Sequence, residues 1–345
     1  MTFDNTRPTA SDALSLTELD LYHRLMDYRA ANGLDPIPLS LNLTTTAGRH
    51  AADTLYNIWQ PNLDLPEGAN LHSWSDAPYF TDHSQPAVMW TAPQRIGTDY
   101  PGYGFEISAA GYGDIGDALA GWQGSPGHDA VILNLGGWAS QTWNAIGIGV
   151  EIDPTVGTYG GRIYHVWFGR EADPDGAGDI EGTNAAETIE GTAFDDRIHG
   201  RSGNDKLMGD AGRDRLMGNG GADRIEGGSG PDRLFGGNGR DTLLGQNGRD
   251  RIDGGRGDDT LTGGKGIDTF VFRAADFGTD TITDFDGDRI RIAAPGEASD
   301  LAQVTAALEQ SGNAVIYDHL GDGQNVIVLQ DTSLATLDLS LFLLG

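Results

Sequence analysis

Aspartate recurs every nine residues through the middle of the chain, and this spacing is the strongest chemical signal in the sequence. Each of the last eight of these aspartates follows a glycine by two positions and precedes an apolar residue by two. Glycine permits positive φ, so turns at these positions can expose backbone carbonyl oxygens. Carboxylate and carbonyl oxygens are the ligands that Ca²⁺ prefers. The predicted metal-binding residues are Asp196, Asp205, Asp214, Asp223, Asp232, Asp241, Asp250, Asp259 and Asp268, with Gly203, Gly212, Gly221, Gly230, Gly239, Gly248, Gly257 and Gly266.

The clearest copies of this repeat read GGSGPDRLF, GGNGRDTLL, GGRGDDTLT and GGKGIDTFV. They resemble the G-G-x-G-x-D-x-U-x nonapeptide of RTX proteins, which builds a parallel β-roll around structural calcium. Two nonapeptides would make one coil, so aspartates 18 residues apart would lie on one edge. Pairing them along both edges gives an estimate of about seven calcium ions. Ala185 and Phe194 replace the second glycine at the start, so we expect the first two nonapeptides to bind metal weakly or not at all.

Calcium should also control folding, because stacked carboxylates repel one another without a cation. In RTX proteins this dependence accompanies type I secretion, directed by an uncleaved C-terminal signal. The resemblance therefore implies a secreted, extracellular bacterial protein whose partners include the type I secretion apparatus. Met1–Asp20 has no signal-peptide pattern. The final LDLSLFLLG, Leu337–Gly345, is predicted to be either the secretion signal or the last strand of a cap.

The residue after each aspartate forms a second pattern. On one face of the predicted roll it is arginine at four successive coils: Arg197, Arg215, Arg233 and Arg251. Like charges at strand spacing repel one another. The arginines either bind an anionic polysaccharide or lipid headgroup, or offset the carboxylates of neighbouring turns.

The first 175 residues hold a different set of polar side chains. They lie in the segments LHSWSD (Leu71–Asp76), GFEI (Gly104–Ile107) and WQGSPGHDAVIL (Trp122–Leu133). Together with MDYRAANGL (Met26–Leu34) and AIGIGV (Ala145–Val150), these segments resemble bacterial CAP-superfamily (SCP-like) domains. The resemblance implies an α-β-α sandwich with a cleft holding His72, Glu106 and His128. The family's second cleft glutamate has no counterpart, although Asp82 and His83 lie nearby.

Two imidazoles and a carboxylate would fill three of four zinc positions and leave one for water. The residues His72, Glu106 and His128 are therefore candidates for a zinc or acid–base site. The alternative is that His72 and His128 hold their loops together by hydrogen bonds. His50 falls beside an apolar helical stripe and is interpreted as a core residue.

The periodicity of the N-terminal region indicates helices first and strands later, which is typical of an α+β fold. Thr17 and Asp20 are expected to cap the first helix, and the second carries Ala47, Ala51 and Leu55 on one face. A third helix should start after Asp114. Two strands are predicted at residues 145–152 and 163–168.

Composition divides the chain into a CAP-like domain (residues 1–175), a β-roll (176–272) and a β-rich C-terminal cap (273–345). Strands are expected at residues 280–292, 314–318 and 325–329 of the cap. The net charge of −29 argues against general nucleic-acid binding. The absence of cysteine excludes disulfides and thiol chemistry, and no apolar run is long enough to cross a membrane.

Three functions are compatible with these patterns. The favoured one is a secreted calcium-binding protein whose CAP-like domain binds an extracellular lipid, glycan or protein. Its tryptophans Trp74, Trp90, Trp138 and Trp143 could line a groove or form the core. The second is a secreted metal-dependent hydrolase that uses the His/Glu cleft, and the third is a structural matrix component. The sequence does not decide whether the protein is an enzyme.

Overall fold

The computed structural model describes residues 4, 13–82, 84–273, 277–292, 301–318 and 323–344. The chain forms two compact units, Met1–Ile180 and Glu181–Gly345. His83, which was considered for the predicted cleft, lies outside the described residues. None of the described helices is long and apolar enough to cross a membrane.

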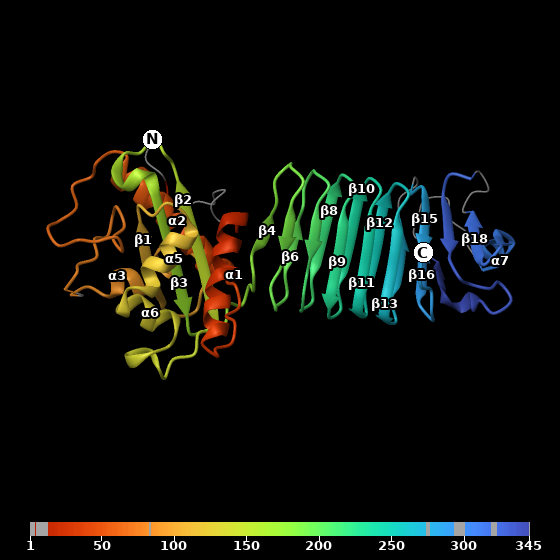
Figure 1. The fold of residues 1–345 in the computed structure, drawn as a ribbon, viewed down its shortest axis with the longest axis horizontal. Coiled ribbons are helices and arrows are strands. Elements are labelled where there is room, and N and C mark those ends of the chain that lie inside the picture. Colours follow the sequence, from red (N-terminus) through yellow and green to blue (C-terminus); the bar gives the residue numbers. More distant parts are fainter. Residues whose placement is uncertain are drawn as a thin grey trace. The chain divides into compact units, whose positions relative to one another are not determined.

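The first unit combines short helices with a three-stranded antiparallel sheet of order β1-β3-β2 (Figure 1). Its elements are α1 (Leu16–Ala31), α2 (Leu41–Asp53), the π-helix η2 (Thr54–Trp59), α3 (Ala87–Trp90), α4 (Ala92–Arg95), β1 (Gly104–Ala110), α5 (Ile115–Gln123), α6 (Pro126–Ile132), η3 (Gly136–Trp138), β2 (Ala145–Ile152), η4 (Thr158–Gly161) and β3 (Arg162–Gly169).

The cap of α1 differs from the prediction. Ser15, not Thr17, is the N-cap: its hydroxyl accepts a hydrogen bond from the backbone N–H of Glu18. The Glu18 carboxylate in turn accepts the backbone N–H of Ser15 at 2.8 Å. This reciprocal pair satisfies two N–H groups at the helix start, which Thr17 and Asp20 cannot do because both lie within the helix. The third helix does begin after Asp114, whose side chain caps α5.

Helix α2 lies directly against one face of the sheet. A side chain at Gly147 or Gly149 of β2 would overlap the backbone of Leu43 or Ala47, so only glycine permits this close approach. In the strand register, Glu106 and Ser108 of β1 face the same side as these two glycines. The contact therefore brings residues of α2 onto Glu106 and its neighbours.

The second unit is a parallel β-solenoid, as the repeat predicts. Its strands are β5 (Thr188–Glu190), β6 (Arg197–His199), β7 (Lys206–Met208), β8 (Arg215–Gly220), β9 (Arg224–Ser229), β10 (Arg233–Asn238), β11 (Thr242–Gly248), β12 (Arg251–Arg256), β13 (Thr260–Gly266), β14 (Thr269–Phe272), β15 (Thr279–Ile282), β16 (Arg289–Ile292), β17 (Leu308–Ser311), β18 (Ala314–Asp318), β19 (Val326–Leu329) and β20 (Phe342–Leu344), with helix α7 (Leu301–Ala306). Strand β4 (Asp179–Glu181) lies where the chain passes between the two units.

From β4 to β16 the strands alternate between two sheets, so each of them pairs with the next but one along the chain (Figure 1). Leu234 of β10, for example, pairs with Leu216 and Ile252, each 18 residues away. All of these middle residues are buried. The row of single apolar side chains that they form between the sheets is the core of the solenoid.

The last coils depart from the nine-residue period. Paired residues in the earlier coils are 18 positions apart. Between β13 and β15 the separation has three residues more, as in the pair Thr260–Thr281, and between β14 and β16 it has two more, as in Thr269–Arg289. The antiparallel strands β17, β18 and β19 follow at the edge of one sheet. Strand β20 pairs with β16, so the described part of the C-terminal LDLSLFLLG segment contributes a strand.

Candidate functional site

The nine-residue aspartates form two ladders of hydrogen bonds along the solenoid. The backbone N–H of each of the first seven donates to Oδ1 of the aspartate 18 residues later, through bonds of 2.8–2.9 Å. Each carboxylate is thereby held in a fixed orientation by the coil before it. This arrangement gives Oδ1 of each carboxylate a hydrogen-bond donor, and the partner of the second oxygen, Oδ2, is a separate question.

The second oxygen, Oδ2, is buried and has no hydrogen-bond partner among the described residues in nine aspartates of the solenoid. They are Asp205, Asp214, Asp223, Asp232, Asp241, Asp250, Asp259, Asp268 and Asp280. A buried carboxylate oxygen without a partner is strongly unfavourable. A bound cation would remove this cost.

The surroundings of these oxygens suit calcium. A side chain at Gly218 would overlap Asp223 Oδ2 and would also lie 2.8 Å from the carbonyl oxygen of Gly236, so both oxygens face the space left by that glycine. Gly227 stands in the same relation to Asp232 Oδ2 and the carbonyl of Gly245. A carboxylate oxygen and a carbonyl oxygen thus lie next to each of these glycines, and both belong to the donor set of Ca²⁺.

Electrostatics supports the same interpretation. The pKa of Asp214 is raised to about 8: burial is the main cause, a backbone hydrogen bond from Asp196 opposes it, and the carboxylates of Asp196 and Asp232 add to it. Burial likewise raises the pKa of Asp241 and of Asp250 to about 7. Without a cation, these side chains therefore ionise reluctantly.

The ladders continue beyond the predicted set. Asp280 Oδ1 accepts the N–H of Asp259, and Asp288 Oδ1 accepts that of Asp268, both at 2.9 Å. The extra residues in the last coils shift these aspartates out of phase, and a strict nine-residue period therefore misses them. Their sequences Asp-Thr-Ile and Asp-Arg-Ile keep the aspartate–x–apolar pattern, which is the signal that could have found them.

The first coil is different, as the missing glycines predict. Thr192 donates both its backbone N–H and its hydroxyl to the carboxylate of Asp196. Both oxygens of Asp196 thus have protein partners, unlike those of the aspartates that follow. Weak or absent metal binding at this end stays a prediction, which this geometry favours.

In the N-terminal unit, Glu106 is surrounded by three histidines. Glu106 Oε1 lies 2.8 Å from Nδ1 of His50 on α2 and also contacts Nδ1 of His165 on β3. Glu106 Oε2 lies 2.9 Å from Nδ1 of His72. The side chains of Glu106, His50 and His165 are fully buried, whereas that of His72 is 18% exposed. The cluster therefore reaches solvent at His72.

Of the predicted cleft residues, His72 and Glu106 are brought together. His128 on α6 has no hydrogen bond or ion pair to Glu106 among the described residues; its pKa is lowered by burial first and by the charge of His72 second. Ser108 adds a hydroxyl, with its Oγ 2.9 Å from His165 Nδ1 and 3.2 Å from His72 Nδ1. Asp82 is exposed and accepts the N–H of Ser84.

His165 and the role of His50 were missed by sequence reasoning. His50 is buried as expected of a core residue, but its ring binds Glu106 and stacks on Trp74 and His165 at 4.4 and 4.0 Å. His165 lies in a strand that reads as apolar on both sides. The alternation of β3 places it beside Ser108, and this pairing was the available signal.

The charges of this cluster balance internally. Burial favours the neutral form of Glu106, but the positive charges of His50, His165 and His72 together outweigh it and lower the pKa of Glu106 well below its usual range. Burial, together with the charge of His50, lowers the pKa of His165 to about 4. Glu106 is thus ionised between hydrogen-bonding imidazoles.

The cluster does not fit zinc as it stands. His50, Glu106 and His165 place their ligand atoms within 4.8 Å of one another. Two atoms that bind one tetrahedral zinc, each at about 2.1 Å from the ion, lie about 3.4 Å apart. The carboxylate oxygen of Glu106 is 2.8 Å from His50 Nδ1, which is a direct hydrogen bond. Of the predicted set, His72 hydrogen-bonds Glu106, and His128 lies close enough to His72 for the charge of His72 to lower its pKa; a common site of His72, Glu106 and His128 stays a prediction.

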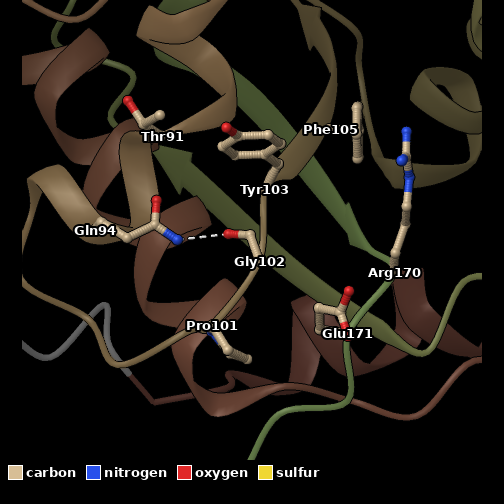
Figure 2. Close-up of a pocket in the computed structure, with 8 residues that line it drawn as sticks. All are labelled: Thr91, Gln94, Pro101, Gly102, Tyr103, Phe105, Arg170 and Glu171. Carbon is tan, nitrogen blue, oxygen red and sulfur yellow. Dashed lines mark hydrogen bonds between the residues drawn. The ribbon is translucent and has the colours of Figure 1, made fainter.

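A separate cavity of about 510 Å³ opens beside Tyr103 and Phe105, with Arg170 and Glu171 on its rim (Figure 2). Trp90 and Trp138 flank Phe105, with ring centroids 6.0 and 5.4 Å away, and both are half-buried. Trp74 and Trp143, in contrast, are core residues. Two of the four predicted groove tryptophans are thus core residues, and the other two pack beside Phe105 without lining the cavity.

Comparison with known proteins agrees with the ladder. The sequence profile of the RTX calcium-binding nonapeptide repeat matches residues 181–216, 217–251 and 235–270. The solenoid is a run of RTX calcium-binding repeats. Among curated proteins, none is a significant sequence match to this chain.

Several solved structures show partial likeness. The extracellular lipase LipA from Serratia marcescens is 18% identical over 49% of this chain, with a TM-score of 0.25, and the match spans only 40% of the lipase. An outer surface protein from Borrelia burgdorferi is 16% identical over 48% of this chain and 96% of its own (TM-score 0.32). The AlgE6R3 subunit of the Azotobacter vinelandii mannuronan C5-epimerase is 24% identical over 47% of this chain and 80% of its own (TM-score 0.26). TM-scores this low carry no functional information.

Proposed function

We propose that this is a secreted protein that folds on calcium outside the cell and presents a ligand-binding domain at its N-terminus. In this proposal residues 1–175 form a CAP-like α-β-α sandwich, residues 176–272 form the calcium-bound β-roll and residues 273–345 cap it. The roll is exported through a type I route, with its signal in the C-terminal segment. The observation that carries the proposal is the row of buried Oδ2 atoms without protein partners.

The aromatic cavity is the favoured ligand site of the N-terminal unit. Tyr103 is 56% exposed and Phe105 presents its ring to the guanidinium of Arg170, 4.7 Å from the centroid. Gln94 donates to the carbonyl of Gly102 at the same rim (Figure 2). Flat apolar faces bordered by a few polar groups suit a small ligand such as a sugar unit, and the volume lies in the range of small-molecule sites.

The cavity is tested with Tyr103→Ala, using Tyr159→Ala as the matched control because both side chains are 56% exposed. A glycan array with the calcium-loaded protein would identify a ligand, and titration of the tryptophan fluorescence would measure its affinity. We expect Tyr103→Ala to weaken binding about tenfold, consistent with the loss of one aromatic contact. Equal affinities of the two variants would refute this site.

A hydrolase is the second candidate, and the position of His72 favours it. His72 is the partly exposed member of the cluster and hydrogen-bonds the ionised Glu106, the arrangement of a general base held by a carboxylate. Zinc titration of the protein and of His72→Ala tests the metal version of this function. Binding that His72→Ala abolishes would support it, and absence of binding would leave only a metal-free acid–base role.

A further inference from the structure

One face of the solenoid carries arginines in register on consecutive strands. Arg233 of β10 pairs with Arg215 of β8 on one side and with Arg251 of β12 on the other. Neighbouring strands in a sheet lie about 4.8 Å apart. Three guanidinium groups are therefore anchored one strand apart along the axis of the roll, an arrangement that is unfavourable unless an anion compensates it.

A second row of side chains runs parallel to the first and encloses a groove. The groove has a volume of about 330 Å³ and is lined by Arg213, Arg233, Arg249, Arg251 and Arg289, with Ile267 among them. Arg213 and Arg249 belong to the position before the repeat aspartate, and Arg233 and Arg251 to the position after it. The positions before and after the repeat aspartate of successive coils thus both line the groove.

These arginines lack the partners that other basic side chains of the roll have. Arg224 binds Glu226 at 2.7 Å, Arg240 binds Asp258 at 3.1 Å and Arg273 binds Asp253 at 2.9 Å. No ion pair among the described residues involves the five groove arginines. Asp232 and Asp250 also line the groove, but their carboxylates are buried in the aspartate ladder and form no ion pair with these arginines among the described residues.

The electrostatic state of Arg251 agrees with an excess of positive charge. Burial lowers the pKa of its guanidinium, and the positive charges of Arg273 and Arg291 lower it further. Asp253 opposes this shift but is bound to Arg273. An anion in the groove would relieve the repulsion between these groups.

We propose that this groove binds a linear acidic polysaccharide, with anionic groups of the chain opposite successive arginines. Guanidinium groups bind carboxylate and sulfate through paired hydrogen bonds, and a row of them at strand spacing suits a polymer with regularly repeated charges. A groove admits one extended chain, whereas a membrane surface requires apolar side chains that insert. Ile267 and Leu343 are the only large apolar side chains exposed among the described residues of this unit.

The test compares two double variants of the full, calcium-loaded protein. Arg233→Gln with Arg251→Gln removes two groove charges, and Arg224→Gln with Arg240→Gln removes the same charge elsewhere on the roll. The probe is a chondroitin sulfate decasaccharide in calorimetry at millimolar calcium, with a neutral maltodextrin of equal length for comparison. Far-ultraviolet circular dichroism verifies that each variant is folded.

We expect the acidic oligosaccharide to bind and the neutral one not to bind. The groove variant should lose roughly tenfold in affinity or more, and the control variant roughly twofold or less. Equal affinities of the two variants would overturn the proposal, as would the absence of binding by a folded protein. Binding to vesicles of anionic phospholipid without binding to the oligosaccharide would also overturn it in favour of a membrane partner. A protein that fails to fold with calcium would instead contradict the proposed function.

Discussion

The two units of this protein both bury carboxylates, but they compensate the buried negative charge in opposite ways. In the solenoid, each aspartate keeps one oxygen for the neighbouring coil and leaves the other for a cation from outside. In the N-terminal unit, Glu106 finds its partners within the chain, in the imidazoles of His50, His72 and His165. The comparison teaches that one unit should depend on calcium and the other on its own protonation.

Calcium removal should give the largest effect. With a chelator, we expect the roll to unfold, because each site contributes roughly 3 kcal/mol at a hundredfold excess of calcium over its dissociation constant. All seven tryptophans lie before residue 170, so their fluorescence reports the N-terminal unit alone. Loss of β-sheet signal in circular dichroism with unchanged tryptophan emission would support the contrast between the units, and simultaneous loss of both would break it.

Glu106→Gln should act on the other unit only. Removal of one partner from a buried ion pair costs about 3–5 kcal/mol, because the remaining charge stays buried. Thermal unfolding followed by tryptophan fluorescence should show this loss, while the calcium affinity of the roll stays the same. Glu67→Gln, in an exposed loop, is the control. Unchanged stability of Glu106→Gln would mean that the imidazoles do not hold Glu106 as an ion.

The stability of the N-terminal unit should depend on pH through Glu18, which lies outside the histidine cluster. Burial raises the pKa of Glu18 to about 7, against hydrogen bonds from Ser15 and Val150 that lower it. The folded unit then binds a proton that the unfolded chain releases near pH 4.5. Stability should therefore fall as pH rises from about 4.5 to 7, by about 3 kcal/mol, and level off above that range.

The variant Glu18→Gln isolates this contribution, because it removes the titrating group and leaves the histidines in place. The difference in unfolding free energy between the two proteins, measured by tryptophan fluorescence at several pH values, should change across that window. A difference independent of pH would show that Glu18 is ionised in the folded unit throughout.

The smallest expected effect is a comparison within the ladder. Asp241→Asn keeps an oxygen for the N–H of Asp223 but removes the charge next to a buried, unpartnered site, so calcium affinity should drop about tenfold. Asp196→Asn should change it little, since Thr192 already binds both oxygens of Asp196. Calcium titration by calorimetry distinguishes the two. Equal effects would imply that the first coil binds metal like the others.

The roll could be predicted from sequence because its contacts repeat at a fixed separation. A residue's partner there is 18 positions away, so one period gives the strands, the inward residues and the aspartate pairs. The nine-residue period did not predict Asp280 and Asp288, because two short insertions shift them out of the period. Both still accept a hydrogen bond in the aspartate ladder. In the N-terminal unit, the strand at 145–152 and the helix after Asp114 were correct, since local periodicity determines them.

The histidine–glutamate cluster could not be predicted in the same way. His50 and Glu106 are 56 positions apart, and no local pattern states that α2 lies against the glycines of β2. Resemblance to a family indicated His72 and Glu106, because those residues match short motifs. The resemblance could not indicate His165. This residue lies in a strand, and only the pairing of that strand with β1 shows that His165 lies beside Ser108.

The aspartate ladder also runs in one direction along the roll. The N–H of each repeat aspartate takes its acceptor from the coil that follows, so a deletion from the C-terminal side leaves such amides without their carboxylate. A deletion from the N-terminal side releases other amides, because Arg215 N–H and Arg224 N–H donate to the carbonyls of Asp196 and Asp205 in the preceding coil. A shortened array would therefore need a cap that supplies hydrogen-bond acceptors at whichever end is cut.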